Sequence, residues 1–567
     1  MATDSSVAIV GGGPIGLALA LHLDMYGVKS TIFNTDSTTR WHPKGNVHNA
    51  RTMELFRKLG LADKIRALGL PGGHPFDVAY FTRLNAFEIA RGRTPSRDER
   101  LRLRDGAPIT DQLPEPTHRV NQMYVERLLF QHAASRPNIT MHFGWTVEAM
   151  AESATDVSLT ARNNAGAEMA WHGAFIIGCD GGRSTMRRAL GVRYEGEEKL
   201  MSAFMSGEIV SIHMSIPQFY EALGPRPAWM YITANSDTRV VIITLNGVDE
   251  FMMHKPLRSG EAIDEDEIRR TVQKAIGAEI PVRIVSQRGW HAGGYLVAER
   301  FQRGRVLLAG DAVHLFTPTG GFGFNTGIED VGNLSWKLAA MLQGWGGERL
   351  LATYQSERKP VALRNAAVAR EMGKAWHDLT VTAAIEQDTA VGAAERAKAA
   401  QSPFVLENHF VRPEERDWLG VVLGARYDNS PIVVPDGPPP ANEPERYTPS
   451  SVPGGRAPHL WLDDSRSAGS SLFDRLGLYF TLLRLPGAPS DTARLEAAAR
   501  KADVPLTVLD VVQPQASELY LRKLTLIRPD QHIAWRGDEL PHDVDALVAT
   551  VVGRASMEAL PQSEPTR

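Results

Sequence analysis

The first residues of the chain place a glycine-rich turn between two apolar segments, the order that a dinucleotide-binding unit requires. Val7–Val10 is a short apolar run typical of a buried parallel strand, and a leucine- and alanine-rich run after the turn predicts a helix. The turn has the pattern G-x-G-x-x-G. In such a turn Gly11 makes the tight bend, Gly13 admits a pyrophosphate, and Gly16 lets helix and strand pack closely. The sequence therefore predicts a Rossmann-like unit here.

A second predicted strand, Ser30–Phe33, ends beside Asn34. Units of this kind usually place an acidic residue at that point to bind a ribose hydroxyl. Asn34 can still hydrogen-bond such a hydroxyl, and Asp36 follows two residues later. A plain NAD(P)-binding domain would carry the same fingerprint, so this turn alone leaves the dinucleotide open. No second G-x-G-x-x-G occurs in the chain, which argues against a second dinucleotide domain.

A second glycine-rich turn lies within residues 303–358. Gly304–Ala309 predicts a short buried strand, because residues 306–309 form an apolar run bounded by glycines. Asp311 follows at its carboxyl end, where a carboxylate can reach a polyol hydroxyl. Thr317–Gly321 is too rich in glycine and proline for a helix, and a helical pattern starts at about Asn325. The amino end of that helix would point unpaired N–H groups over the turn, which favours an anion or a developing negative charge.

A third block combines an apolar strand, an Asp-Gly turn and a basic helix start. Phe175–Gly178 predicts the strand, Asp180 and Gly181 form the turn, and the arginines of 183–188 follow. A plain strand–turn–helix with solvated arginines is the simpler interpretation of this block alone. Its position between the other two turns favours a shared site.

Taken together, these blocks resemble the motifs of the single-component (class A) FAD-dependent aromatic hydroxylases, which share the p-hydroxybenzoate hydroxylase fold. The resemblance implies that Asp311 binds the ribityl chain of FAD, and that Pro318 lies near the reactive flavin carbon as a catalytic residue. It implies further flavin-binding residues in the following turn, namely Gly320, Gly321, Gly323, Phe324 and Asn325. The glycines would leave room for the flavin to move between a reduction position and a hydroxylation position.

The same resemblance implies roles for residues elsewhere. Asp180, Gly181 and Arg187 would serve the FAD pyrophosphate and NAD(P)H. Arg51, at the start of an R-T-M-E helix, and Gln122, at the start of another helix, would contact FAD.

In the loop before Arg51, relatives often carry a His or Asp that helps to deprotonate a phenol. Asn46 stands at that position and His48 lies two residues later, so both are catalytic candidates. A purely structural hydrogen bond is the alternative role for His48.

Composition limits the remaining function classes. The chain has 567 residues, 43% hydrophobic and 23% charged residues, and a net charge of −4, which gives no case for nucleic acid or an anionic membrane as a partner. Cys179 is the only cysteine, no metal-ligand cluster stands out, and neither a membrane span nor a leader sequence is evident. We expect a cytoplasmic enzyme.

The end of the chain reads as a separate α/β module. After a proline-rich stretch, predicted strands and helices follow in the order βαβ and then ββα, which resembles the thioredoxin-like tail of the larger phenol hydroxylases. Arg528–Arg536 (RPDQHIAWR) matches their hairpin. Without a cysteine pair this module cannot perform thiol redox chemistry, so a packing role or support of a homodimer is expected.

Between the second and third blocks the sequence is rich in strands. Val210–Ile216 alternates apolar and polar residues, which predicts a sheet with one buried face, and residues 77–87 are expected to join it. Such a sheet could line a site for an apolar ring. Candidate lining side chains are the aromatic and sulfur residues Phe204, Met205, Trp229, Met230, Tyr231, Phe251, Met252, Met253, Trp290 and Tyr295.

The expected fold is therefore α/β: a Rossmann-like FAD-binding domain with an inserted mixed β-sheet substrate domain and a C-terminal thioredoxin-like domain. The expected parts are FAD-binding 1–75, substrate-domain strands 76–118, FAD-binding 119–190, substrate sheet 191–297, FAD-binding and long helices 298–400, a proline-rich linker 401–455, and the thioredoxin-like domain 456–567.

The expected function is a flavoprotein monooxygenase that uses NAD(P)H and O2 to hydroxylate a small phenolic substrate. The resemblance implies that oxygen adds to flavin C4a and that the resulting hydroperoxide attacks an electron-rich ring. One alternative is hydroxylation or Baeyer–Villiger oxidation of a larger polycyclic substrate, such as a polyketide or an aromatic antibiotic. The other is a non-enzymatic flavin-binding protein.

Overall fold

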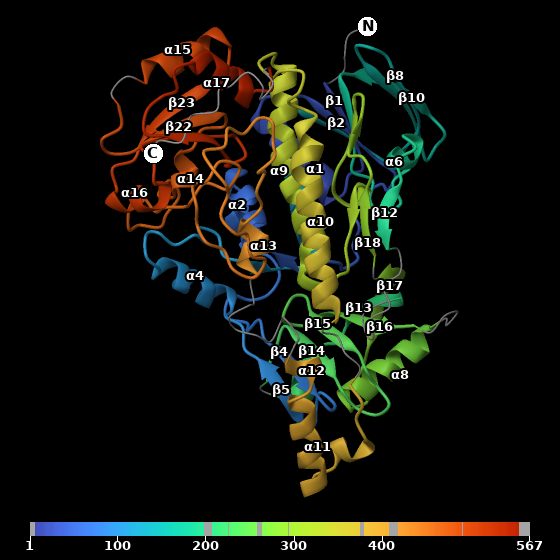
Figure 1. The fold of residues 1–567 in the computed structure, drawn as a ribbon. Helices are drawn as coiled ribbons and strands as arrows, with labels where there is room; N and C mark the ends of the chain where they lie inside the picture. The colour runs from blue at the N-terminus through green and yellow to red at the C-terminus, as the bar shows by residue number, and fades with distance from the viewer. Residues whose placement is uncertain are drawn as a thin grey trace.

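The computed structural model describes residues 6–197, 207–224, 226–257, 263–292, 294–374, 379–406, 418–489 and 492–554. A six-stranded sheet forms the centre of the FAD-binding part (Figure 1). Its order is β19 (Gln302–Arg303), β20 (Val306–Leu308), β11 (Phe175–Gly178), β1 (Val7–Val10), β2 (Ser30–Asn34) and β7 (Ile139–Phe143). All strands but β19 run parallel, so the predicted Rossmann-like core is confirmed.

Long helices connect this sheet to the rest of the molecule. They include α1 (Pro14–Met25), α2 (Ala50–Lys58), α5 (Gln122–Ala134), α9 (Phe322–Leu342) and α10 (Thr353–Lys374). Helix α9 packs against α1, α2 and α10, and it begins three residues before the predicted Asn325. The alanine-, glutamate- and arginine-rich sequence after Arg358 predicts one long helical stretch towards Ala400, but the structure divides it. Helix α10 ends at Lys374, and η3 (Ala383–Glu386) and α11 (Ala390–Ala400) follow as separate elements.

Three small sheets and three short helices complete the FAD-binding part and its edges. The sheets are β8 (Trp145–Glu152), β9 (Val157–Asn163) and β10 (Glu168–Gly173); β12 (Tyr194–Glu197), β18 (Tyr295–Ala298) and β21 (His314–Leu315); and β3 (Val47–His48) with β6 (His118–Arg119). The short helices are α3 (Ala62–Arg66), α4 (Arg97–Asp105) and α6 (Thr185–Ala189). A fourth, α12 (Pro403–Leu406), packs instead against strand β4 (Val78–Phe81) of the second part, with the Phe404 ring 5.7 Å from that of Tyr80.

A seven-stranded mixed sheet forms the second part of the molecule, below the central helices in Figure 1. Its order is β17 (Arg283–Ala292), β13 (Gly207–Ser215), β16 (Glu250–Pro256), β15 (Val241–Thr244), β14 (Met230–Thr233), β4 (Val78–Phe81) and β5 (Glu88–Gly92). Helices α7 (Phe219–Leu223) and α8 (Glu265–Ile276) cover its outer face. The prediction that residues 77–87 add a strand to this sheet is confirmed by β4.

The inner face of this sheet corrects one prediction. Strand β13 was expected to have one buried face, but Ser211, His213 and Ser215 on its polar side are also buried. The reason is that this side faces the FAD-binding part: Tyr124 of α5 donates from its hydroxyl to Glu250 Oε2 of β16 at 2.8 Å. Of the predicted lining residues, Phe204 and Met205 lie outside the described residues.

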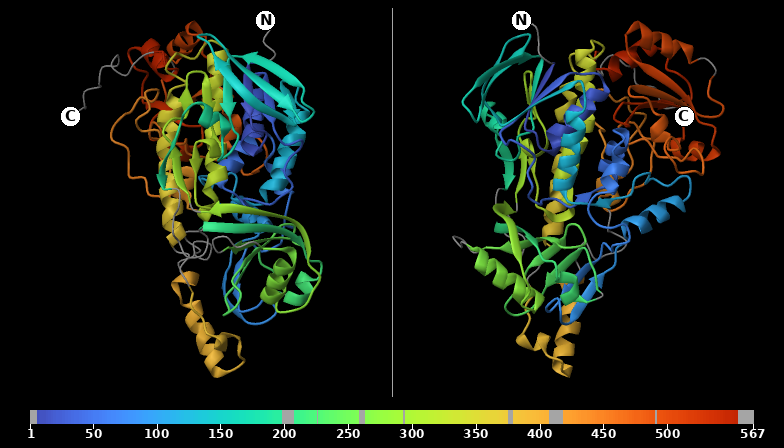
Figure 2. Two further views of the ribbon diagram at one scale, coloured as in Figure 1. Left: turned by 90° about the vertical axis from the view of Figure 1, so that its right-hand side faces the viewer. Right: turned by 180° about the vertical axis from the view of Figure 1, so that it is seen from behind.

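The C-terminal domain lies beside α9 and α10 in both views (Figures 1 and 2). Its sheet has the order β23 (Leu506–Asp510), β22 (Phe480–Arg484), β24 (Leu524–Ile527) and β25 (Ile533–Gly537). Helices α15 (Ala493–Lys501) and α17 (Val544–Val551) complete the predicted βαβ and ββα order, which is confirmed. The sequence predicts a helix over residues 491–502, and residue 491 lies outside the described residues. Two further helices, α14 (Leu472–Arg475) and α16 (Pro514–Tyr520), are not predicted by the sequence pattern.

The segment expected to be a linker is packed against the protein. Beyond the short helix α13 (Leu419–Leu423), residues 427–451 are extended, as their prolines predict. However, Tyr427, Ser430 and Ile432 are buried, because apolar and hydrogen-bonding side chains alternate with the prolines. Ser430 donates to Glu357 Oε1 of α10 at 2.6 Å. The segment therefore joins the C-terminal domain to the long helices.

A buried ionic cluster fastens the C-terminal domain to these helices. Glu357 of α10 accepts hydrogen bonds from Arg528 at 2.7 and 2.8 Å and from Lys337 of α9 at 2.6 Å. Arg528 also pairs with Asp530 at 2.6 Å. Burial alone would raise the pKa of Glu357, but Arg528 and Lys337 outweigh burial and lower this pKa to about 2. The carboxylate is therefore charged at neutral pH.

Within the described residues, no helix is both long and apolar enough to cross a membrane.

We predict that Glu357→Ala destabilises the protein by about 3–5 kcal/mol, because it leaves Arg528 and Lys337 buried without their shared carboxylate. Thermal unfolding measured by circular dichroism tests this. Arg269→Ala is the control, since the ion pairs of Arg269 on α8 are exposed and their loss should change the melting temperature far less. Equal changes in the two variants would contradict a fastening role for the cluster.

Candidate active site

The first glycine-rich turn has the close approaches that its pattern requires. Gly11 has φ +112°, and a Cβ at this position would lie 2.4 Å from the carbonyl oxygen of Cys179. A Cβ on Gly16 would lie 2.0 Å from the carbonyl oxygen of Gly11. A Cβ on Gly13, by contrast, would meet nothing within 4 Å. Gly11 and Gly16 therefore serve packing of the protein itself, whereas Gly13 borders open space at the amino end of α1.

Asn34 braces this turn. Its Oδ1 accepts a hydrogen bond from the backbone N–H of Gly12 at 2.9 Å, and its Nδ2 donates to the carbonyl oxygen of Asp36 at 3.0 Å. An Asp at position 34 could accept the first bond but could not donate the second. The asparagine thus connects the end of β2 to the turn that follows β1.

The Asp-Gly turn leaves one polar atom without a partner. Asp180 Oδ2 accepts hydrogen bonds from Thr185 N at 2.7 Å, Thr185 Oγ1 at 2.9 Å and Met186 N at 3.1 Å, which fixes the carboxylate at the start of α6. Asp180 Oδ1 is buried and makes no hydrogen bond within the described part of the chain. Gly181 has φ +81°, and a Cβ there would meet nothing within 4 Å. The turn has the free acceptor and the open space that a hydroxyl-bearing ligand needs.

A tyrosine that the sequence did not single out connects the two acidic turns. The Arg187 guanidinium lies over the ring of Tyr194, 3.8 Å from its centroid, and donates to the carbonyl oxygen of Gly182 at 3.1 Å. The Tyr194 hydroxyl donates to the carbonyl oxygen of Asp311 at 2.5 Å. Tyr194 therefore links Arg187 to the turn at Asp311, although these two residues are far apart in sequence.

The buried carboxylate of Asp330 stabilises the turn that contains Asp311. Asp330 of α9 accepts hydrogen bonds from Gly310 N at 3.3 Å and Arg358 Nε at 2.8 Å, and its Oδ2 lies 2.7 Å from His314 Nε2. His314, Asp330 and Arg358 lie within residues 303–358, but no periodicity or motif marked them for this role. The Asp311 side chain is itself exposed on the turn.

The second glycine-rich turn leads directly into α9. Pro318 precedes the turn, and Gly320 and Gly321 have φ +77° and +67°, conformations that favour glycine. Because the N-cap residue is Gly321, it has no side chain to cap the first N–H groups of the helix. Asn325 fixes the turn through Nδ2, which donates to the carbonyl oxygens of Gly321 at 2.6 Å and Val47 at 2.9 Å. Gly323, where a Cβ would meet nothing within 4 Å, borders open space.

The loop at 44–49 lies against this turn. Asn325 Oδ1 accepts from the backbone N–H of Asn49 at 2.9 Å, and the His48 ring lies 4.8 Å from the Phe324 ring. The side chain of Asn46 is bonded to Asn121 Nδ2 at 2.7 Å, which ties the loop to α5 beside Gln122. The structure thus brings His48, Asn46, Gln122 and Phe324 to one region.

Burial determines the charge of His48. The side chain is buried, and neither ring nitrogen makes a hydrogen bond to a described residue. Burial lowers the pKa of His48 to about 3, so the ring is neutral at physiological pH. A neutral imidazole can hydrogen-bond a phenol, but with this pKa it is a weak base for deprotonating one.

Arg51 points away from this region. Its guanidinium donates to Gln531 Oε1 at 2.5 Å, to the carbonyl oxygen of Asp530 at 2.8 Å and to Glu54 at 2.8 Å. These bonds place Arg51 at the junction with the C-terminal domain. Two of the three acceptors belong to the hairpin of the C-terminal domain, and the FAD contact expected for Arg51 stays a prediction.

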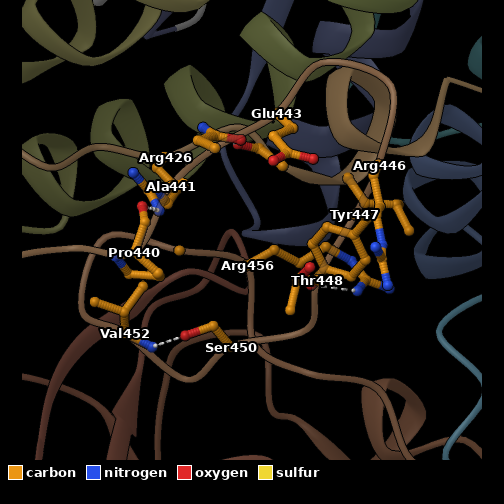
Figure 3. A pocket seen from close by; sticks show the side chains of 14 residues that line it. Arg426, Pro440, Ala441, Glu443, Arg446, Tyr447, Thr448, Ser450, Val452 and Arg456 are labelled. Atoms are coloured by element: carbon orange, nitrogen blue, oxygen red, sulfur yellow. Dashed lines mark hydrogen bonds between the residues drawn. The ribbon is translucent and has the colours of Figure 1, made fainter.

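A cavity of about 260 Å³ lies elsewhere, between α13 and the extended segment up to Arg456 (Figure 3). Three arginines line it, namely Arg426, Arg446 and Arg456. Arg456 bonds to Glu54 at 2.6 Å, and Arg426 donates to the carbonyl oxygen of Pro440 at 2.6 Å. None of the predicted site residues lines it. The cavity belongs to the domain junction.

The residues of the three turns fit FAD. The open space at Gly13 lies at the amino end of α1, where a pyrophosphate is stabilised by the helix dipole and the free N–H groups. The unpaired Asp180 Oδ1 and the exposed Asp311 carboxylate can accept hydrogen bonds from cofactor hydroxyls. The uncapped start of α9 can stabilise negative charge on the flavin ring.

We predict that two glycine substitutions affect different properties, one the affinity for FAD and the other the stability of the protein. Gly13→Ala should leave the melting temperature of the FAD-free protein unchanged and lower FAD affinity at least about tenfold, because its Cβ fills only the open space. Gly16→Ala should lower the melting temperature itself, because its Cβ would clash with Gly11. Thermal unfolding of the FAD-free variants and titration with FAD separate the two effects. Full FAD affinity in Gly13→Ala would contradict the cofactor position.

Comparisons with known proteins identify the family. Residues 4–369 match the model of an FAD binding domain, and residues 450–555 match that of the aromatic-ring hydroxylase C-terminal domain. The FAD-dependent monooxygenase apdD of Emericella nidulans is 32% identical, with 97% of this chain and 90% of the relative covered. A putative polyketide hydroxylase of Streptomyces halstedii is 28% identical over 94% of this chain and 93% of its own length.

A solved structure supports the same assignment. The native and K252c-bound RebC-10x structure has a TM-score of 0.86 and 32% identity, covering 98% of this chain and 100% of that chain. The likeness extends over all three parts of the fold. The chain therefore belongs to the FAD-dependent monooxygenases of the aromatic-ring hydroxylase family.

Proposed function

We propose that this monooxygenase uses NAD(P)H and O2 to hydroxylate a phenolic aromatic substrate. The observation that carries the proposal is the junction of Arg187, Tyr194 and Asp311, which holds two cofactor turns together beside the start of α9. When bound, FAD accepts electrons from NAD(P)H and activates O2 for transfer to a ring. The protein positions the reactants and excludes water.

Each turn then has a distinct task. Asp180 and Asp311 would hold hydroxyl groups of FAD, and Gly13 would admit its pyrophosphate. Pro318 and the N–H groups at the start of α9 would lie against the flavin ring, where the positive end of the helix dipole stabilises an anionic reduced ring. Arg187, stacked on Tyr194, supplies a fixed positive charge that suits the phosphates of FAD or NAD(P)H.

The substrate would lie between the loop at 44–49 and the inner face of the seven-stranded sheet. His48 offers unpaired nitrogens in this region, and Phe324 supplies an aromatic edge beside it. Tyr124 and Glu250 close the space between α5 and β16 with a hydrogen bond of 2.8 Å. A dry site of this kind protects a reactive oxygen species from water.

A larger polycyclic substrate is the second candidate, with either ring hydroxylation or Baeyer–Villiger oxygen insertion as the reaction. The specific support is the likeness to a protein named as a putative polyketide hydroxylase, which extends over 94% of this chain. The two reactions differ in product: one gives a phenol, whereas the other converts a ketone to an ester or lactone.

We predict that phenols, catechols or hydroxylated polycyclic quinones stimulate NAD(P)H oxidation by the FAD-loaded protein, with products heavier by one oxygen atom. Stopped-flow absorbance and product mass, measured in parallel for NADH and NADPH, test this. Oxidation that yields only hydrogen peroxide for every compound, or no stimulation by any phenol, would contradict phenol hydroxylation. Product formed only from ketones would favour oxygen insertion.

We predict that His48→Ala lowers the rate of product formation at least about tenfold while changing the rate of flavin reduction less than twofold, because His48 is expected to contact the substrate rather than NAD(P)H. Single-turnover measurements separate the two steps. The control is His142→Ala, since the His142 ring stacks on Phe33. Equal losses in both steps would assign His48 to structure alone.

A further inference from the structure

The junction cavity, as we name the space of about 260 Å³ between α13 and the extended segment up to Arg456, has no part in the proposed hydroxylation (Figure 3). None of the residues proposed for the cofactor or for the phenol lines it. A water molecule takes up roughly 30 Å³ in the liquid, so the cavity has room for about nine waters or for one small organic molecule. Its polar lining indicates the chemistry of such a molecule.

Three arginines line the cavity, and their positive charges are compensated unequally. Arg456 is 2% exposed, and its Nε and Nη2 donate to Glu54 at 3.2 and 2.6 Å. Arg426 Nη2 donates to Asp428 Oδ2 at 3.0 Å. Arg446 is exposed and forms no ion pair with a described residue. Two of the three guanidinium groups therefore have a carboxylate partner, and the third is available to an anion.

The two paired arginines also keep donors that are not fully used. A guanidinium group can donate five hydrogen bonds. Arg426 Nη1 donates to the carbonyl oxygen of Pro440 at 2.6 Å, but its Nε is buried and has no acceptor in the described part of the chain. Arg456 Nη1 has only a long contact, 3.5 Å, with the Tyr447 hydroxyl. Because buried donors almost always have an acceptor, an oxyanion beside these side chains would complete their hydrogen bonding.

The rest of the polar lining suits hydroxyl groups. Ser450 Oγ accepts a hydrogen bond from Val452 N at 3.3 Å, which leaves its own hydrogen available to donate (Figure 3). Among the described residues that line the cavity, Glu443 is the one acidic side chain, and it is exposed. A carboxylate accepts hydrogen bonds from hydroxyl groups but repels an anion. A molecule with an anionic group at one end and hydroxyl groups at the other matches both halves of this lining.

We propose that the junction cavity binds a small phosphate monoester with a hydroxylated body, such as a sugar phosphate. Arg426 and Arg446 would hold the phosphate, whose oxygens match the fork of a guanidinium group, and Glu443 would accept from a hydroxyl group. A phosphate ion, with five heavy atoms, would fill only part of a space that has room for about nine waters. The inference is independent of the proposed hydroxylation, because it uses no residue of the cofactor turns.

Ligand binding to the full-length, FAD-loaded protein tests the proposal in a buffer free of phosphate and sulfate. Ribose 5-phosphate, ribose and inorganic phosphate are each titrated by calorimetry, and the melting temperature is measured with each compound. Ribose 5-phosphate should bind at least about tenfold more tightly than either of the others, since it alone has both kinds of group. Ribose binding as tightly as ribose 5-phosphate, or a sugar phosphate that gives neither heat nor a higher melting temperature, would overturn the proposal.

Two variants assign the binding to this cavity. Arg446→Gln and Arg426→Gln should each weaken ribose 5-phosphate binding at least about tenfold, because each removes a charged donor. Arg446 is the safer substitution for folding, since it is exposed, and melting temperature and FAD content verify both variants. The matched control is Arg500→Gln, an exposed arginine of α15 outside the cavity, which should change the affinity less than twofold. Unchanged affinity in both cavity variants would place the sugar phosphate elsewhere and contradict the proposal.

A third variant tests the hydroxylated body of the ligand. Glu443→Ala removes both an acceptor for hydroxyl groups and a negative charge near the phosphate. Inorganic phosphate should therefore bind more tightly to this variant, and the preference for ribose 5-phosphate over inorganic phosphate should fall at least about threefold. An unchanged preference would mean that Glu443 does not contact the ligand, and the assignment of a sugar phosphate would be wrong.

Discussion

The parallel pairing of three neighbouring strands determines where the chemistry of this protein can occur. Val10 of β1, Gly178 of β11 and Leu308 of β20 lie side by side in register. Parallel strands bring their carboxyl ends to one edge of a sheet, so the turns that follow them meet there although hundreds of residues separate them in sequence. Every cofactor residue proposed on these turns depends on that pairing. Side chains such as Asn34 and Asp330 then hydrogen-bond to the turns and stabilise their conformation.

This pairing explains why much of the fold could be predicted from the sequence. Short apolar runs followed by glycine turns have strong local signals, and β1, β11 and β20 were each predicted within two residues of their bounds. The order of elements in the C-terminal domain could be predicted equally well, because strand and helix periodicities alternate there. The break between α10 and α11 was missed because alanine, glutamate and arginine favour helix wherever they occur, and composition does not mark the end of a helix.

The site could be predicted only where a local conformation carries the function. Gly13 and Gly181 stand in glycine-rich turns that the sequence displays directly, and their cofactor roles stay predictions. Tyr194 has no such local signal, since it acts by lying between Arg187 and Asp311 in space. Arg51 shows the same limit of prediction from local sequence. Its three partners include two in a hairpin 480 residues away, and no pattern around position 51 reveals which domain will face it.

The protein places polar groups in two kinds of buried setting, and the contrast indicates which of them serves a ligand. Around Glu357, every charge has an opposite charge within hydrogen-bond distance, because an unpaired ion at a domain junction would oppose association of the domains. At the Asp-Gly turn, by contrast, Asp180 Oδ1 is buried and makes no hydrogen bond within the described part of the chain. The charges that join the domains are neutralised within the protein, whereas the carboxylate at this turn keeps an acceptor that a ligand hydroxyl could use.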